Sequence, residues 1–185
     1  MKTILLAGAL WGAALFAQLD HAPRYSKTGK LLLPADYREW IFLSSGLGMR
    51  YSAEGAASPN PPFDNVFVNP EAYHAFLRTG TWPDKTVLVL EVRLSASQTS
   101  INKDGRVQTT AGRVAEIHLK DASRGGWAFY EFPQGAQEGN LLPKDRDCYS
   151  CHAKNGAVDT TFVQFYPTLI DTAKAKGTFR QEPGQ

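Results

Sequence analysis

The feature that most constrains this sequence is the pentapeptide Cys-Tyr-Ser-Cys-His at residues 148–152. It contains both cysteines of the 185-residue chain and one of its four histidines. Two thiols three positions apart, followed at once by an imidazole, are typical of redox dithiols, metal sites and porphyrin attachment sites. Whichever chemistry applies, the fold must bring these three side chains to one place late in the chain.

The C-x-x-C-H spacing is the attachment signature of c-type haem. In this interpretation Cys148 and Cys151 form thioethers with the two vinyl groups of one porphyrin, and His152 is the axial iron ligand. One motif then predicts one covalent haem c per chain. A thioredoxin-like dithiol would belong to a βαβ unit, which the sequence lacks, and a structural zinc site needs about four ligands. A plain disulfide remains an open alternative.

The N-terminal residues differ from the rest of the chain. Lys2 precedes an apolar stretch of about 15 residues, and polar residues follow from Gln18 onward. A basic start before such a stretch is typical of a secretory signal peptide, and the stretch is short for a membrane span. We predict that the leader is cleaved after Ala17, that the mature protein is periplasmic, and that the chain has no stable membrane span. A buried N-terminal helix or an uncleaved anchor is the alternative.

Composition predicts an ordinary globular protein. Hydrophobic residues make up 43% of the chain, charged residues 21%, and the net charge is +2, which gives no indication of a nucleic-acid partner. We expect four parts: a signal peptide (residues 1–17), a flexible N-terminal segment (18–30), one haem domain (31–176) and a disordered tail (177–185).

Hydrophobic patterning predicts an α+β fold, with a mostly antiparallel sheet and flanking helices. Helices are expected over residues 31–48, 69–80 and 160–176. Strands are expected over residues 63–68, 86–95, 113–121 and 126–132. We expect Pro167 to kink the last helix. In the strand over 86–95 the even positions are apolar, so we expect the odd face, with Glu91, to be at the surface.

The sixth iron ligand would decide what the haem does. Electron-transfer cytochromes fill this position with Met or His, whereas an open position binds gases or substrates. Beyond the leader, Met49 is the sole methionine, and we interpret it as a core residue. His74 and His118 have polar neighbours and His21 is in the flexible N-terminal segment, so we expect all three to be solvated surface residues. The sequence therefore predicts an open or water-ligated iron.

Six segments strengthen this interpretation because of their order and spacing. They read LLLPADYREW, NVFVNPEAYHAFLRTG, WPDKTVLVLEV, GGWAFYEF, CYSCH and FVQFYP. Together they resemble the cytochrome P-460 family over about residues 30 to 170. The resemblance implies a mostly antiparallel β domain with flanking helices, usually a homodimer, that holds one five-coordinate c haem. Catalytic members of this family oxidise hydroxylamine to nitrogen oxides, and the related cytochromes c′-beta bind nitric oxide or carbon monoxide.

Two departures separate this chain from the catalytic members. Those members have a strand lysine that is covalently joined to the porphyrin, and the corresponding position here is Leu90. Lys85 lies five residues earlier, on the opposite face of the strand by parity. Catalytic members also have an arginine just ahead of the strand that matches NVFV, where this chain has Phe63 and Asp64. We expect a distal pocket in which Phe63, Phe67 and Leu90 form an apolar cap, with Asp64 beside it.

An apolar cap favours a neutral diatomic ligand over a polar substrate that must lose protons. The leading hypothesis is an exported haem protein that binds nitric oxide or a related small gaseous or nitrogenous ligand. The first alternative is a hydroxylamine-oxidising enzyme, with Asp64, Glu91 or Glu131 as a proton acceptor. The second is an electron-transfer cytochrome with Met49 as sixth ligand and another cytochrome as redox partner.

Overall fold

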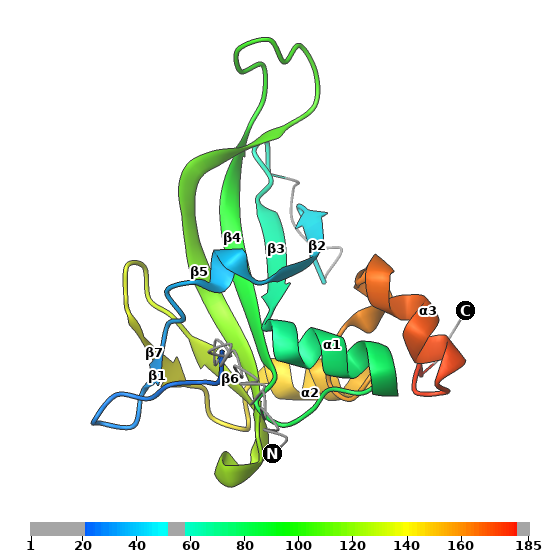
Figure 1. Cartoon of the computed structure of the whole chain (residues 1–185). Coiled ribbons are helices and arrows are strands. Elements are labelled where there is room, and N and C mark those ends of the chain that lie inside the picture. Colours follow the sequence, from blue (N-terminus) through cyan, green and yellow to red (C-terminus); the bar gives the residue numbers. More distant parts are fainter. Residues whose placement is uncertain (1–20, 52–57, 181–185) are drawn as a thin grey trace, which may run out of the picture.

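The computed structural model describes residues 21–51 and 58–180 of the chain (Figure 1). Its strands are β1 (Leu31–Leu32), β2 (Ile41–Leu47), β3 (Phe63–Val68), β4 (Val87–Ala96), β5 (Val107–Asp121), β6 (Gly126–Glu131) and β7 (Glu138–Leu141). Its α-helices are α1 (Pro70–Thr79), α2 (Asp147–Asn155) and α3 (Pro167–Ala175). Three short 3-10 helices are η1 (Tyr37–Glu39), η2 (Ala122–Arg124) and η3 (Val163–Phe165). The predicted signal peptide lies outside the described residues.

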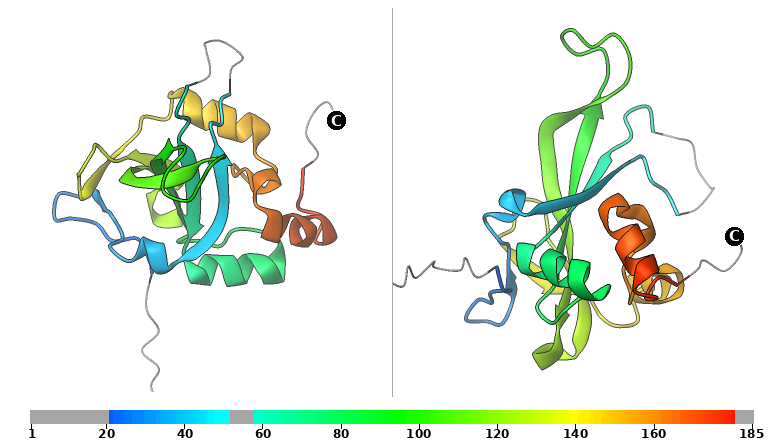
Figure 2. Two further views of the ribbon diagram at one scale, coloured as in Figure 1. Left: turned by 90° about the horizontal axis from the view of Figure 1, so that it is seen from above. Right: turned by 45° about the vertical axis from the view of Figure 1, so that its right-hand side comes forward.

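The strands form one sheet of seven, in the order β1-β7-β6-β5-β4-β3-β2, and every neighbouring pair is antiparallel. Figure 2 shows the sheet curled, with α1, α2 and α3 beside it. The long β4–β5 hairpin projects beyond the rest of the molecule (Figure 1). The predicted α+β fold with a mostly antiparallel sheet is confirmed. Within the described part of the chain, no helix has the length and apolar character needed to cross a membrane.

Two hydrophobic cores lie on the two faces of the sheet. The helix-side core joins the sheet to α1, η3 and α3, and Phe76 and Trp82 are at its centre with their rings 4.4 Å apart. The second core lies inside the curl of the sheet. Its buried members are Leu31, Tyr37, Trp40, Val87, Val89, Val114, Ile117, Leu119, Ala128, Tyr130 and Phe132. Successive strand residues point to opposite faces, so central strands such as β4 supply both cores.

The prediction that β4 has one buried and one exposed face is wrong. Val87 and Val89 on its odd face are buried in the second core, whereas Leu94 on its even face is 54% exposed. Glu91, expected at the surface, is only 2% exposed. Its carboxylate is ion-paired with Arg93 at 2.7 Å and also with Arg38. Two guanidinium groups compensate the buried charge, and this explains how an acidic residue can be buried on this face of the sheet.

The predicted helix over residues 31–48 is also wrong. This segment forms β1, the single turn η1 and then β2, which pairs with β3 from Ile41↔Val68 to Leu47↔Phe63. Tyr37 and Trp40 are buried in the second core, but Ile41 packs against the helix-side core. The spacing of Tyr37, Trp40 and Ile41, which is typical of a helix face, therefore comes from one 3-10 turn followed by a strand.

The remaining elements agree with the sequence more closely. The four predicted strands are confirmed as β3 to β6, although β5 begins at Val107 and not at residue 113. The helix after Asn69 is confirmed as α1, which ends at Gly80 with φ of 75°. Pro167 does not kink a helix but begins α3 after the short turn η3, because proline suits the first helical position and disfavours helix before it.

The N-terminal segment before β1 contacts the sheet. The Tyr25 hydroxyl donates to Asp121 at 2.8 Å, and Asp121 also accepts from Lys85 and from the Ser123 hydroxyl at 2.6 Å. Burial alone would raise the pKa of Asp121, but the hydrogen bonds from Lys85, Ser123 and Tyr25 lower it to about 2. The flexibility predicted for residues 18–30 and the boundaries of the predicted domain stay predictions.

We predict that Glu91→Gln lowers the free energy of unfolding by about 3 kcal/mol, because it leaves the largely buried Arg93 without a carboxylate partner. Urea denaturation measures the loss. Glu39→Gln, which removes an exposed carboxylate in η1, is the matched control. A loss equal to that of the control would mean that the Glu91 charge is not needed.

We predict an acid-sensitive contribution from Asp121. Its folded pKa of about 2 lies below the ordinary 3.8, so the ionised group stabilises the fold above about pH 4. That contribution is lost as the pH falls from about 4 towards 2. Unfolding free energies across this window should fall less steeply in Asp121→Asn than in the parent chain. Asp104→Asn, in the exposed β4–β5 loop, should keep the parental slope.

Candidate haem site

Helix α2 presents the three motif side chains on one face. Cys148, Cys151 and His152 occupy positions i, i+3 and i+4, which are neighbours on a helix surface. All three line a cavity of about 480 Å³. Neither thiol is in a disulfide, so the disulfide alternative is not the arrangement of this structure. The volume is in the range of small-molecule and cofactor sites in proteins.

Strands β3, β4 and β5 form the wall that faces α2. Val66, Leu88 and Leu90 are the apolar part of this wall, and Phe162 from the segment after α2 adds an aromatic side. Figure 2 shows α2 and α3 on the same side of the sheet. The cavity is therefore an apolar space between a rigid sheet and the helix that bears the motif.

His152 is oriented by one hydrogen bond. Its Nδ1 donates to the carbonyl oxygen of Thr160 at 2.8 Å, and the rings of Phe162 and Phe129 lie 4.1 and 4.7 Å from its ring. Burial lowers the pKa of His152, and the bond to Thr160 partly opposes this shift. The neutral ring therefore bears its proton on Nδ1, and Nε2 is the nitrogen available to a metal.

The acceptor for His152 is in a tight turn over residues 158–161, which we term the Thr160 turn. The amide of Thr161 donates to the carbonyl of Val158 at 2.9 Å, and Asp159 has a left-handed φ of 53°. The Trp82 indole donates to the Thr161 hydroxyl at 2.8 Å, and Lys120 pairs with Asp159 at 3.2 Å. Contacts from two other parts of the chain thus fix the turn.

Gly156 allows the Thr160 turn to approach α2. A Cβ at this position would lie 2.8 Å from the His152 carbonyl oxygen, from the Thr160 carbonyl carbon and from the Thr161 amide nitrogen. The end of α2 is held from the other side by Arg180, whose guanidinium donates to the carbonyls of Ala153, Lys154 and Gly156. These contacts satisfy carbonyl groups that a helix end leaves unpaired.

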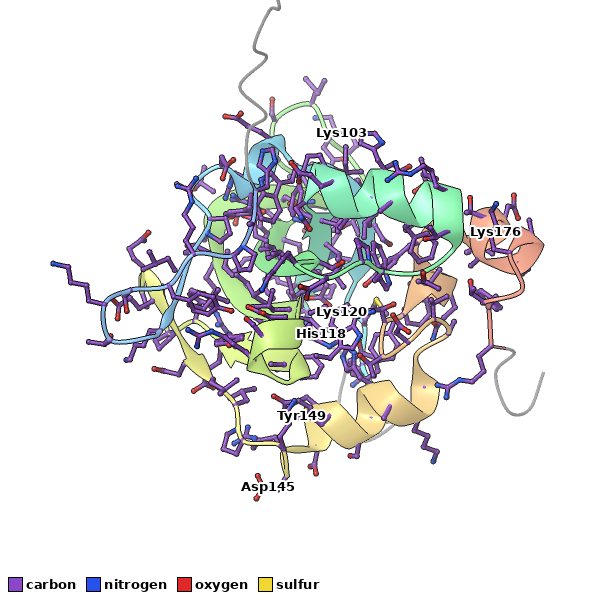
Figure 3. All side chains as sticks on the ribbon, turned by 60° about the horizontal axis from the view of Figure 1, so that its bottom comes forward. Lys103, His118, Lys120, Asp145, Tyr149 and Lys176 are labelled. Carbon is purple, nitrogen blue, oxygen red and sulfur yellow. The ribbon has the colours of Figure 1, made fainter. Side chains whose placement is uncertain are left out.

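His118 corrects a sequence prediction, because it is 7% exposed and not solvated. It is at an even position of β5 that faces the cavity, and its ring stacks on Phe129 with centroids 4.0 Å apart. Burial, with His152 and Lys144 nearby, lowers the pKa of His118 well below its usual value. Its polar strand neighbours made a buried position hard to predict. Its pairing with Phe129 on the neighbouring strand could have indicated that His118 is buried. Figure 3 labels His118 and Tyr149, the latter on α2.

The predicted distal residues divide between the two faces of β3 and β4. Leu90 and Asp64 line the cavity. Phe63 and Phe67 do not, because they alternate with Asp64 along β3 and point to the other face. Phe67 instead packs edge-on against Tyr37 at 5.6 Å. The expected cap of Phe63, Phe67 and Leu90 is therefore corrected to a wall of Val66, Leu88 and Leu90.

Three acidic residues, Asp64, Glu116 and Asp147, line the cavity, and the sequence indicated one of them. Burial raises the pKa of Asp64, which was a predicted candidate. Burial, and then repulsion from Glu131, raises the pKa of Glu116, which sequence reasoning missed. Glu116 is two positions from His118 on the same strand face, and that parity is the signal that could have identified it. Glu91 is on the opposite face and Glu131 is exposed, so neither lines the cavity.

Other candidate ligands differ in their positions. Met49 lines the cavity and packs on Gly46, where a Cβ would lie 2.1 Å from its Sδ. His74 is exposed, as predicted. His21 is not a solvated residue, because its ring bonds Glu71 at 2.8 Å and its side chain is 12% exposed. Over residues 21–51 and 58–180, no lysine lines the cavity.

A helix face with two thiols and an oriented imidazole, set beside an apolar cavity, is the arrangement expected of a cytochrome. The family model for Cytochrome P460 matches residues 34–163. The chain therefore belongs to the cytochrome P460 family, and membership implies a haem. No curated protein sequence matches the chain. The residues present fit such a group, because two thiols and an uncommitted imidazole nitrogen come from one helix face beside the cavity.

We predict that Gly156→Ala destabilises the fold by about 2 kcal/mol, because the added methyl group overpacks against three backbone atoms. Displacement of the Thr160 turn should also weaken the hydrogen bond of His152. Urea denaturation measures the first effect, and the ¹⁵N resonance of His152 Nδ1 measures the second. Lys154→Ala, on the exposed side of α2, is the control. An unchanged resonance would show that Gly156 is not needed for the approach.

Proposed function

We propose that this chain is an exported mono-haem c-type cytochrome with an open distal position that binds nitric oxide or a related small neutral ligand. The observation that carries the proposal is the convergence of Cys148, Cys151 and His152 on one cavity-facing side of α2. The two thiols would hold the porphyrin as thioethers, and His152 would be the axial ligand through Nε2. When bound, the haem supplies a one-electron couple and one coordination position for a small ligand.

The distribution of the other side chains supports an open distal position. His118 lies edge-on to His152 with ring centroids 5.1 Å apart, so it belongs to the proximal side. The facing wall of Val66, Leu88 and Leu90 has no side-chain atom that can bind iron. Such a wall excludes charged species and favours a neutral diatomic ligand, since burial of an unpaired charge is costly.

Specific observations also favour two other candidates. Glu116 and Asp64 line the cavity, burial raises the pKa of each, and a carboxyl group beside a bound substrate can accept or donate a proton. They favour a hydroxylamine-oxidising enzyme, against which stands Leu90 in the position of the family's lysine. Met49 lines the cavity and could become a sixth ligand, and this favours an electron-transfer cytochrome that passes electrons to another cytochrome.

Export, dimerisation and stoichiometry form part of the same proposal. The basic, then apolar, start of the sequence supports a cleaved leader and a periplasmic site, where thioether attachment takes place. Membership of the cytochrome P460 family is the support for a homodimer. A single pair of cysteines supports one haem per chain.

The experiment is expression of the full chain in a host with a periplasmic c-haem maturation system. We expect a mature mass equal to residues 18–185 plus one haem, and haem that resists extraction by acidified acetone. Cys148→Ala/Cys151→Ala should lose covalent haem, whereas His74→Ala should retain it, because His74 is exposed on α1. Extractable haem in the parent chain would contradict the proposal.

Optical spectra of the ferrous protein distinguish the three candidates. The proposed binding function predicts a high-spin spectrum that nitric oxide and carbon monoxide convert, with no turnover of hydroxylamine. A low-spin spectrum that resists both gases, and becomes high-spin in Met49→Leu, would instead establish the electron-transfer candidate. Steady-state hydroxylamine oxidation, lost in Glu116→Gln, would establish the enzyme.

A further inference from the structure

Thr160 contacts both histidines of the proximal side. Its backbone carbonyl accepts from Nδ1 of His152 at 2.8 Å, while its side-chain hydroxyl is hydrogen-bonded to Nε2 of His118 at 3.3 Å. One residue thus joins the buried His118 of β5 to the motif histidine of α2, 34 positions further along the chain. Figure 3 labels His118 and its strand neighbour Lys120, which holds the same turn through Asp159.

The His118 ring is itself held firmly. It stacks nearly parallel on Phe129, with an interplanar angle of 8°, and also packs on Trp127 at 4.3 Å. Phe129 is its direct cross-strand partner in the β5–β6 ladder. The ring of His118 therefore takes its position from the sheet, and not from the loop that contains Thr160.

We propose that His118 is a positioning residue for the axial histidine, and that it acts through Thr160. The sheet fixes His118, the hydroxyl of Thr160 bonds to it, and the carbonyl of the same residue is thereby held on His152 Nδ1. A fixed acceptor at Nδ1 selects the tautomer and makes Nε2 a stronger donor to a metal. This inference rests on the proposed function of His152 as axial ligand.

The inference explains why a histidine is buried in this position. A purely apolar ring would complete the stack with Phe129 and Trp127 equally well, and it would avoid the cost of burying ring nitrogens. The Thr160 hydroxyl would then lack this partner. Histidine keeps the aromatic packing and adds one polar atom at the place where the turn must be held.

The test compares the ferrous haem-loaded full chain with two single variants. Thr160→Val removes the hydroxyl but keeps the volume and the carbonyl, and His118→Phe keeps the ring but removes Nε2. Both should shift the iron–histidine stretching band to lower frequency and raise the midpoint potential, because Nε2 becomes a weaker donor. His118→Gln, which restores a polar group, should return both readouts towards the parent values.

The double variant His118→Phe/Thr160→Val should shift no further than the larger single, because both changes remove one interaction. Thr168→Val, an exposed threonine in α3, is the control and should match the parent. The inference would be overturned if Thr160→Val kept the parental stretching frequency and midpoint potential. It would also be overturned if the shifts of the two single variants added up in the double variant. If His118→Phe does not fold, Thr160→Val decides alone.

Different results would contradict the haem attachment and the positioning role of His118. If the parent chain holds no covalent haem by mass, the proposed function and the inference both fail. If haem is attached and the His152→Ala variant loses the iron–histidine band, the proposed function stands. If Thr160→Val and His118→Phe then leave the stretching band and the potential unchanged, only the positioning role of His118 is overturned.

Discussion

The hydrogen bond from His152 Nδ1 to the Thr160 carbonyl is the interaction on which the rest of the site depends. Helix α2 can place two thiols and an imidazole on one face, but helical geometry does not choose between the two ring nitrogens. A carbonyl can only accept, so its position 2.8 Å from Nδ1 makes that choice. Gly156, Trp82 and Asp159 have a common role, because all three help to keep the carbonyl oxygen of Thr160 in place.

The antiparallel sheet gives this small arrangement a rigid reference. Its central strands are covered on both faces, so each is tied into two cores and into two ladders of hydrogen bonds. The cavity lies on the helix side, where β3, β4 and β5 oppose α2. On the other side the buried Glu91 carboxylate is neutralised by Arg38 and Arg93. The ionic network and the proposed haem site are thus separated by the thickness of the sheet.

The motif predicts that Cys148, Cys151 and His152 come together, as they do along one cavity, but the residues that face them were partly misplaced. The i, i+3, i+4 spacing within residues 148–152 is local, so the sequence determines it directly. The facing wall depends on strand parity, and Asp64 and Phe67 cannot line the same cavity because three positions separate them on β3. His118 looked solvated because its strand neighbours are polar, but burial of that strand face is decided by α2. Trp40 and Ile41 mimicked a helix because a 3-10 turn runs directly into a strand.

The alternation along β4 has an evolutionary consequence. Val87 and Val89 are part of the second core and Leu88 is part of the helix-side core, whereas Leu90 lines the cavity and belongs to neither core. Selection for a stable fold therefore acts on positions 87 to 89, whereas position 90 can respond to selection for the chemical task. The residue at position 90 can change during evolution while the core residues at positions 87 to 89 stay the same. The wall of the cavity can in this way change at one position while both cores keep their residues.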